Sequence, residues 1–180
     1  MLAVKNHIIV KVWTSQKEEI VINGNLFKTG INYNENFREK NPVVAYVKDG
    51  IGEIKSGSWI VCNYNYFDWS SPYCMFDDIY TIPVNEEIFA IINEDGTLKP
   101  INGNILVERV TIESVLELPE ELKKPHINRG IVASGFGNYK KGDFIFWLPY
   151  SDYEIVYNWN GIEKRALKIH HSEIVGRIKK

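Results

Sequence analysis

Residues Arg129 to Phe146 read RGIVASGFGNYKKGDFIF, and this stretch limits the fold more than any other part of the sequence. It contains a small and apolar strand, a glycine-rich turn, a polar corner around Gly142 and a second, aromatic strand. A weaker copy runs from Val43 to Val61, with KSGSWIV in place of KKGDFIF. A chain that carries the same strand-turn-strand unit twice is expected to fold as two related β modules.

The spacing of matching segments extends this repeat over the whole chain. The matched pairs are Ile8 with Ile105, offset 97 (105 − 8), Lys55 with Lys140, offset 85 (140 − 55), and Ile88 with Ile174, offset 86 (174 − 88). The fall in offset places a connection in the first copy that is longer by roughly ten residues, where insertions are best tolerated. We therefore predict two domains, residues 1–97 and 98–180.

Short apolar or alternating runs at turn spacing predict strands throughout. The expected strands are His7–Trp13, Val43–Val47, Ser58–Asn63, Tyr80–Pro83, Ile88–Ile92, Ile105–Val110, Tyr153–Trp159, Ala166–Ile169 and Ile174–Ile178. Asn23-Gly24 and Asn160-Gly161, each flanked by apolar residues, predict hairpins. The pattern indicates an all-β fold of small barrels or sandwiches and excludes a parallel α/β sheet.

Composition excludes several classes of protein. With 44% hydrophobic residues and a formal charge of −2 over 180 residues, the chain is expected to fold and to lack a general attraction for nucleic acid. No apolar run reaches the roughly 20 residues that span a bilayer, so no membrane partner is expected. The opening MLAVKNHIIVKVW resembles a strand more than a signal peptide, and we expect a cytoplasmic protein.

Candidate chemical residues are few. Cys62 and Cys74 have no other Cys or His at metal-ligand spacing beside them, so no metal is expected. Two interpretations of the pair are open: a disulfide, or two free thiols. Adjacent residues on a strand point to opposite faces, which argues against shared sites at Glu86-Glu87 and His170-His171. Gly135-x-Gly137 lacks the rest of a dinucleotide fingerprint, so no cofactor is expected. We predict that the protein is not an enzyme.

An aromatic cluster follows the first corner. Its members are Tyr64, Tyr66, Phe67, Trp69, Tyr73 and Phe76. Two interpretations are open: a platform on which a ligand stacks, or partly buried aromatic side chains at a barrel mouth or subunit contact.

The order of motifs from Pro100 to Lys180 resembles the GroES-like co-chaperonin (chaperonin-10) family. The motifs are the opening strand ILVERV, VLELP at 115–119, KPHINRGIV at 124–132, KGDFIF at 141–146 and the closing HSEIVGRI at 171–178. The first half is similar mainly at HIIVKV, VVAYV, KSGSWIV and EEIFAII. One departure is that Gly135 to Tyr139 leaves room only for a tight turn where the family has a roof hairpin.

The resemblance implies two tandem GroES-like small β-barrels and a homo-oligomer that caps a chaperonin ring during ATP-dependent folding. In the family, an apolar tripeptide on a mobile loop binds the chaperonin; the matching residues are Leu116, Glu117 and Leu118, and in the first half Ile20, Val21 and Ile22. Burying an unpaired carboxylate costs several kcal/mol, so Glu117 is expected to point to solvent. An alternative is a phage or bacterial structural protein, a head or neck component, that reuses the barrel without chaperonin binding.

Overall fold

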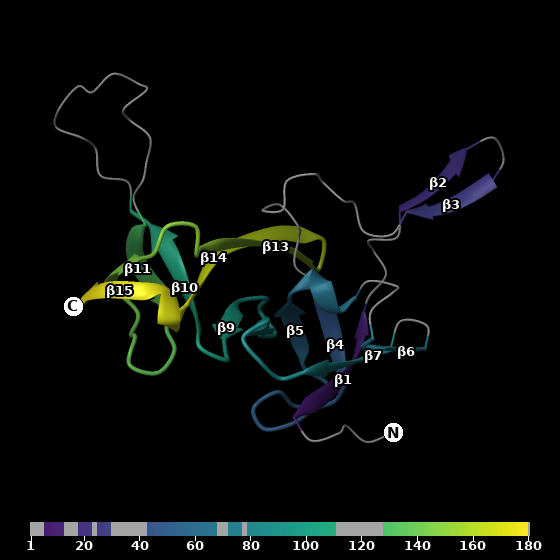
Figure 1. Ribbon diagram of the computed structural model, residues 1–180, viewed down its shortest axis with the longest axis horizontal. Helices are drawn as coiled ribbons and strands as arrows, with labels where there is room; N and C mark the ends of the chain where they lie inside the picture. Colours follow the sequence, from purple (N-terminus) through teal and green to yellow (C-terminus); the bar gives the residue numbers. More distant parts are fainter. Residues whose placement is uncertain are drawn as a thin grey trace.

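The structure, a computed structural model, describes residues 6–12, 18–22, 25–29, 43–67, 72–76, 79–110 and 128–179. It consists of two antiparallel sheets and a separate two-stranded hairpin (Figure 1). The described residues contain two short 3-10 helices, Tyr64–Tyr66 and His171–Glu173, and no α-helix. The predicted all-β class is therefore confirmed.

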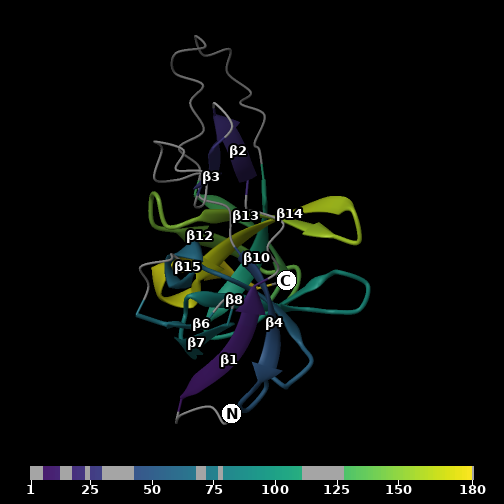
Figure 2. The same ribbon diagram turned by 90° about the vertical axis from the view of Figure 1, so that its right-hand side faces the viewer.

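The first sheet has seven strands in the order β6-β7-β1-β4-β5-β8-β9. In that order the strands are Cys74–Phe76, Ile79–Pro83, His7–Val12, Val43–Asp49, Trp59–Cys62, Ile88–Ile92 and Leu98–Pro100. The hairpin β2 (Glu18–Ile22) and β3 (Asn25–Thr29) falls between β1 and β4 in sequence and lies above both sheets in two views (Figure 1, Figure 2).

The second sheet has six strands in the order β13-β14-β10-β11-β12-β15. In that order they are Tyr153–Trp159, Ile162–His170, Asn104–Arg109, Arg129–Ser134, Phe144–Trp147 and Ile174–Ile178. The two orders correspond strand by strand. In the first sheet, β6, β7, β1, β4, β5 and β8 are the counterparts of β13, β14, β10, β11, β12 and β15. The internal similarity of the sequence therefore corresponds to a shared strand order.

Strand pairing repeats with the offsets seen in the sequence. Val10 pairs with Val47 in the first sheet, and Val107 pairs with Val132 in the second, at offsets of 97 (107 − 10) and 85 (132 − 47). In each sheet a register shift comes directly before this pair. It lies between Ile9 and Val10 in the first sheet and between Leu106 and Val107 in the second. The two sheets thus share bulges as well as order.

The glycine-rich corner repeats at the level of single hydrogen bonds. The Val47 amide donates to the Ser58 carbonyl at 2.9 Å, and the Val132 amide donates to the Asp143 carbonyl at 2.9 Å. Both partners are displaced by 85 residues (132 − 47 and 143 − 58). Inside the second corner the Tyr139 amide donates to the Phe136 carbonyl at 3.1 Å, which confirms the tight turn predicted there.

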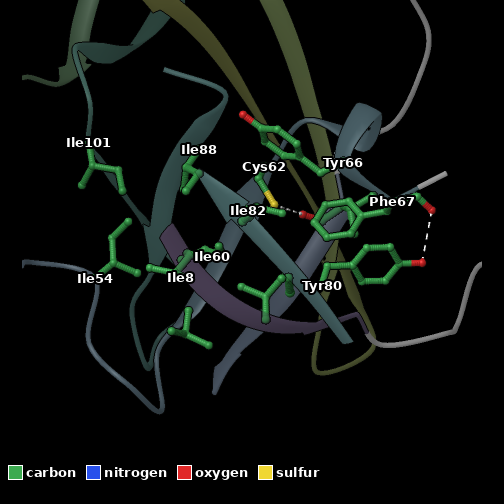
Figure 3. Packing of buried hydrophobic residues seen from close by; sticks show 14 residues of the cluster. Ile8, Ile54, Ile60, Cys62, Tyr66, Phe67, Tyr80, Ile82, Ile88 and Ile101 are labelled. Atoms are coloured by element: carbon green, nitrogen blue, oxygen red, sulfur yellow. Dashed lines mark hydrogen bonds between the residues drawn. The ribbon is translucent and has the colours of Figure 1, made fainter. Parts of the chain in front are cut away.

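Each sheet packs one of its faces on an apolar core. Figure 3 shows how the side chains of the first core pack together. Its members with no exposed area are Ile8, Val10, Ala45, Val47, Ile60, Cys62, Ile82, Ile88 and Ile101. The second core contains Ile105, Val107, Val132, Ile145, Trp147 and Ile169. Alternate residues of each strand supply these cores, as expected for sheets with one face turned inward.

A third apolar cluster joins the two sheets. From the first sheet it takes Val61, Phe89, Ala90, Ile92 and Leu98, and from the second Leu106, Ile155 and Tyr157. Trp59 meets Trp159 edge to face across it, with ring centres 5.9 Å apart. The buried Tyr157 hydroxyl donates to the Gly96 carbonyl at 2.7 Å. We call this cluster the joint.

Main-chain pairing also crosses the predicted domain boundary. β9 begins at Leu98, one residue after the first predicted domain, yet it pairs with β8 as the last strand of the first sheet. Proline has no amide hydrogen and is tolerated on an edge strand, which is where Pro100 stands. The division at residues 97 and 98 stays a prediction.

Both predicted hairpins are formed. β13 and β14 pair through Trp159 and Ile162, and Asn160 and Gly161 between them have φ of 51° and 80°. Two consecutive positive φ values are the mark of the type I′ turn that Asn-Gly favours. β2 and β3 pair around residues 23 and 24, as that Asn-Gly pair predicted.

The corner glycines generate a stability prediction. A Cβ at Gly135 would lie 1.9 Å from the Tyr139 carbonyl oxygen, so the strand and the turn cannot both keep their places around a side chain. Gly135→Ala is expected to lower the free energy of unfolding by about 1–3 kcal/mol in urea denaturation. The control is Gly137→Asn, because Gly137 has open space and a φ of 58° that asparagine tolerates. Equal stability of Gly135→Ala and wild type would contradict this account.

Lys168 of β14 lies in a largely apolar setting at the joint. Its Nζ is 4.4 Å from the Phe89 ring centre and 5.8 Å from that of Tyr153. Burial lowers the pKa of Lys168, and the nearby Glu87 opposes this in part. Two aromatic faces thus replace part of the water around the ammonium group.

This setting predicts a dependence of stability on pH. Because the folded-state pKa of Lys168 lies below its usual 10.5, the unfolded chain binds that proton more tightly, and stability rises with pH between the two values. Lys168→Met keeps the apolar stem, and its free energy of unfolding is expected to lack this rise and to be at least as large at pH 7. Urea denaturation from pH 7 upward checks this. Lys164→Met, on the same strand, should keep the wild-type profile; an unchanged profile for Lys168→Met would refute the prediction.

Candidate partner-binding site

Two connections occupy equivalent places in the two sheets. One joins β1 to β4 and the other joins β10 to β11, and in both cases the joined strands are antiparallel neighbours. The first contains 30 residues (43 − 12 − 1) and the second 19 (129 − 109 − 1). The first is longer by 11 (30 − 19), which confirms the expected difference of roughly ten.

The predicted binding residues fall on these two connections. Ile20, Val21 and Ile22 lie in β2, where they pair with Phe27, Leu26 and Asn25 of β3. Leu116, Glu117 and Leu118 of the second connection lie outside the described residues. The structure therefore places one predicted tripeptide on a paired strand and leaves the position of the other a prediction.

Specific contacts hold the two ends of the second connection. Arg109, the last residue of β10, forms an ion pair with Asp152, whose side chain is 11% exposed. At the other end the Trp147 amide donates to the Asn128 carbonyl at 2.9 Å. The points at which this connection leaves and rejoins the sheet are thus fixed by β12 and by the turn after it.

A buried thiol stands where the first connection rejoins its sheet. The Sγ of Cys62 is 3.6 Å from the Val43 carbonyl oxygen, to which it donates (Figure 3). Burial raises the pKa of the Cys62 thiol well above its usual range, so the thiol stays protonated and unreactive near neutral pH. Cys62 and Cys74 are not joined, so of the two readings the disulfide is wrong.

The Gly-Asp corner is a structural ion-pair site. The buried Asp143 carboxylate lies 2.6 Å from the Arg177 guanidinium and accepts a 2.7 Å hydrogen bond from the Lys140 amide. The guanidinium also lies 5.3 Å from the Tyr139 ring centre. A carboxylate with these partners ties the last strand, β15, to the corner.

The aromatic cluster packs onto the first core. Tyr66 and Phe67 are buried, and Tyr66 meets Tyr73 edge to face at 5.2 Å. The Tyr66 hydroxyl donates to Asn85 Oδ1 at 2.7 Å, and burial raises its pKa to about 12. These members follow the buried alternative and not the ligand platform. Trp69 lies outside the described residues, as does the side chain of Phe76.

His170 and His171 lie side by side, so the prediction that these adjacent residues face opposite ways is wrong. β14 ends at His170 and His171 begins a 3-10 turn, so the two rings lie side by side with centres 4.5 Å apart. His170 Nδ1 is 2.6 Å from Ser172 Oγ, and burial lowers the His170 pKa, as does the nearby His171. Among the described residues no group of three His, Cys, Asp or Glu could hold a metal.

Sequence reasoning missed an apolar surface on the second sheet. Phe144 and Phe146 of β12 lie edge to face at 5.2 Å, and Val175 and Ile178 of β15 are 62% and 60% exposed. The signal was present in FIFW, where Phe144 and Phe146 alternate with the buried Ile145 and Trp147, and in the apolar Val175 and Ile178 of IVGRI. An apolar outer face is a mark of an interaction surface.

Comparison with protein-family models, with curated proteins and with solved structures gives no significant match. In the part of the chain that the structure describes, no helix has the length and apolarity needed to cross a membrane.

Proposed function

We propose that the protein is a co-chaperonin, built from two GroES-like barrels, that caps a chaperonin ring and assists ATP-dependent protein folding. The observation that carries the proposal is the equivalence of the two connections. Each leaves and rejoins the same pair of equivalent strands, and each contains an apolar tripeptide-like segment, at Ile20–Ile22 and at 116–118. The resemblance of the motifs assigns chaperonin binding to this connection.

The binding step is burial of apolar side chains in a groove on the chaperonin. Leu116 and Leu118 are the anchors of the second connection, and Glu117 between them faces solvent because an unpaired carboxylate is costly to bury. Ile20, Val21 and Ile22 are the anchors of the first. Ordering a segment on binding consumes part of its contact energy, so each contact is weak and the assembly supplies avidity.

The weakness of single contacts suits a cap that must also leave. A contact near the micromolar range has a binding free energy of about −8 kcal/mol, whereas several linked contacts bind far more tightly. The contacts of Arg109 and Asn128, which hold the two ends of the second connection, would set where its contact falls relative to the sheet. ATP binding by the chaperonin would then control all the contacts together.

A binding experiment tests this proposal. The protein, a purified chaperonin ring and ATP are expected to co-elute, and the ATPase rate of the ring to change. Leu116→Ser and Leu118→Ser each remove a side chain whose burial contributes about 1.5–3 kcal/mol, so each is expected to weaken a single contact by about tenfold or more. A triple change of Ile20, Val21 and Ile22 to Ser tests the first connection in the same way.

Ile51→Ser is the matched control. Ile51 is 42% exposed and follows β4 at the end away from the connection, so its loss should leave co-elution unchanged. Absence of association with any ring, the host's own included, would rule the proposal out. Recovery of the protein in fixed stoichiometry within a particle would favour the structural alternative instead.

A further inference from the structure

Lys168 stands where strands of both sheets meet. It lies in β14 and pairs directly with Tyr153 of β13, and its Nζ lies 4.4 Å from the ring centre of Phe89 in β8 of the first sheet. The Phe89 and Tyr153 rings are in contact with each other, at an angle of 53° and with centres 5.4 Å apart. Two aromatic rings from different sheets thus form an apolar wall beside the amine.

The ammonium group of Lys168 has no hydrogen-bond acceptor within the described part of the chain. Its Nζ makes cation–π contacts with Phe89 and Tyr153, and no hydrogen bond or ion pair with any described residue. Lys168 Nζ is also not one of the fully buried polar atoms that lack a hydrogen bond among these residues, so solvent reaches it. The amine is therefore poorly solvated and still accessible from outside.

The charged neighbours of Lys168 are mostly acidic. The titratable groups around it are Glu86, Glu87, Tyr153, His170 and Glu173. The carboxylates attract the positive charge, but burial has the larger effect and lowers the pKa of Lys168. Asn63 Nδ2 donates a hydrogen bond to Glu87 Oε2, which holds this carboxylate in position. The surroundings therefore favour cations over anions.

A lysine in this setting is a nucleophile. Only the neutral amine attacks an electrophilic carbon, and poor solvation of the ammonium form makes the neutral amine more abundant near pH 7 than it is for a lysine in water. The apolar wall formed by Phe89 and Tyr153 offers a surface on which an alkyl or aromatic group packs.

The charge of the product indicates which electrophile suits this amine. An acylated lysine is neutral, so it loses both the cation–π contact with Phe89 and the attraction of the carboxylates. A protonated imine keeps the positive charge and retains both interactions. Anionic reagents are repelled by Glu86, Glu87 and Glu173. An uncharged aldehyde satisfies all three conditions.

We propose that Lys168 is a site of Schiff-base formation with uncharged, apolar aldehydes. The neutral amine nitrogen bonds to the carbonyl carbon, and a proton passes from nitrogen to oxygen to give a carbinolamine. A second proton on that oxygen lets it leave as water, so the C–O bond breaks and the C=N bond forms. Starting from the ammonium form, the net reaction releases one water and no proton. The inference rests on the setting of Lys168 and is independent of chaperonin binding.

Labelling with benzaldehyde tests the site. The folded protein is incubated at pH 7 with benzaldehyde and cyanoborohydride, which reduces the imine to a stable secondary amine, and peptide mass mapping identifies the labelled amines. Lys168 is expected to be labelled several-fold faster than Lys164, whose Nζ donates a 2.7 Å hydrogen bond to the Asp95 carbonyl. Mapping also separates both lysines from the α-amino group, whose ordinary pKa is about 7.7–8.0.

Variants and urea show whether the folded setting causes the reactivity. Lys168→Met is expected to lose the fast phase of labelling, and Lys164→Met, on the same strand, is expected to keep it. In concentrated urea the advantage of Lys168 over Lys164 should vanish, because both amines are then solvated alike. Circular dichroism confirms that each variant is folded before labelling.

A charged analogue tests the predicted class of aldehyde. At Lys168 the preference for benzaldehyde over para-formylbenzoate should be greater in the folded protein than in urea, because the carboxylates repel the anion. Glu87→Gln keeps an acceptor for Asn63 and removes one negative charge, so it is expected to reduce this preference.

Three results would overturn the inference. The first is equal labelling of Lys168 and Lys164 in the folded protein. The second is a fast phase that persists in folded Lys168→Met, or an advantage of Lys168 that persists in urea. The third is a preference for benzaldehyde at Lys168 that is the same in the folded protein, in urea and in Glu87→Gln.

Discussion

Burial of both faces of two strands, β5 and β8, holds the two sheets together. One face of each strand belongs to the first core, through Ile60 and Ile88, and the other belongs to the joint, through Val61 and Phe89. Apolar area removed from water contributes roughly 25 cal/mol per Å². The area that β5 and β8 bury in the joint therefore stabilises these strands in addition to the area that they bury in the first core. Their sequences, WIVC and IFAII, are apolar at every position for this reason.

The equivalent strands of the second sheet, β12 and β15, pack only one face on an apolar core. β12 alternates half-buried and buried residues, and β15 has its inner contacts at Ile174 and at the Asp143–Arg177 ion pair. Arg129 stands where the first sheet contributes Val44 to the joint, and Gly176 stands where it contributes Ala90. The two repeats share their strand order and pairing register, and they differ in how apolar their outer faces are.

Most of the fold was readable from local signals. Asn-Gly pairs, the glycine corners and short alternating runs act over a few residues, and they placed Ile88–Ile92, Tyr153–Trp159 and Ile174–Ile178 at their observed bounds. The offsets of 97 and 85 held in the pairing because the hydrogen bonds of the corner depend on turn chemistry that both copies retain.

What the sequence did not predict depends on contacts between distant segments. β9 is not among the expected strands, and its pairing with β8 makes it an edge strand of the first sheet, where Pro100 is tolerated. His170 and His171 lie side by side because the strand ends between them, and strand ends are the least certain feature of a sequence-based prediction. Local periodicity does not predict the joint, because a short apolar run is compatible with a strand that packs on one core or on two.

Covalent linkage changes what an interface needs in order to form. Within one chain the two repeats meet at an effective concentration near the millimolar range for a short connection, so the joint forms at any protein concentration. The equivalent face of the second sheet has Arg129 and Gly176 in place of Val44 and Ala90, so it is less apolar at these two positions. Tandem repetition in one chain therefore lets the second repeat cover one copy of this apolar surface without the need for a second chain.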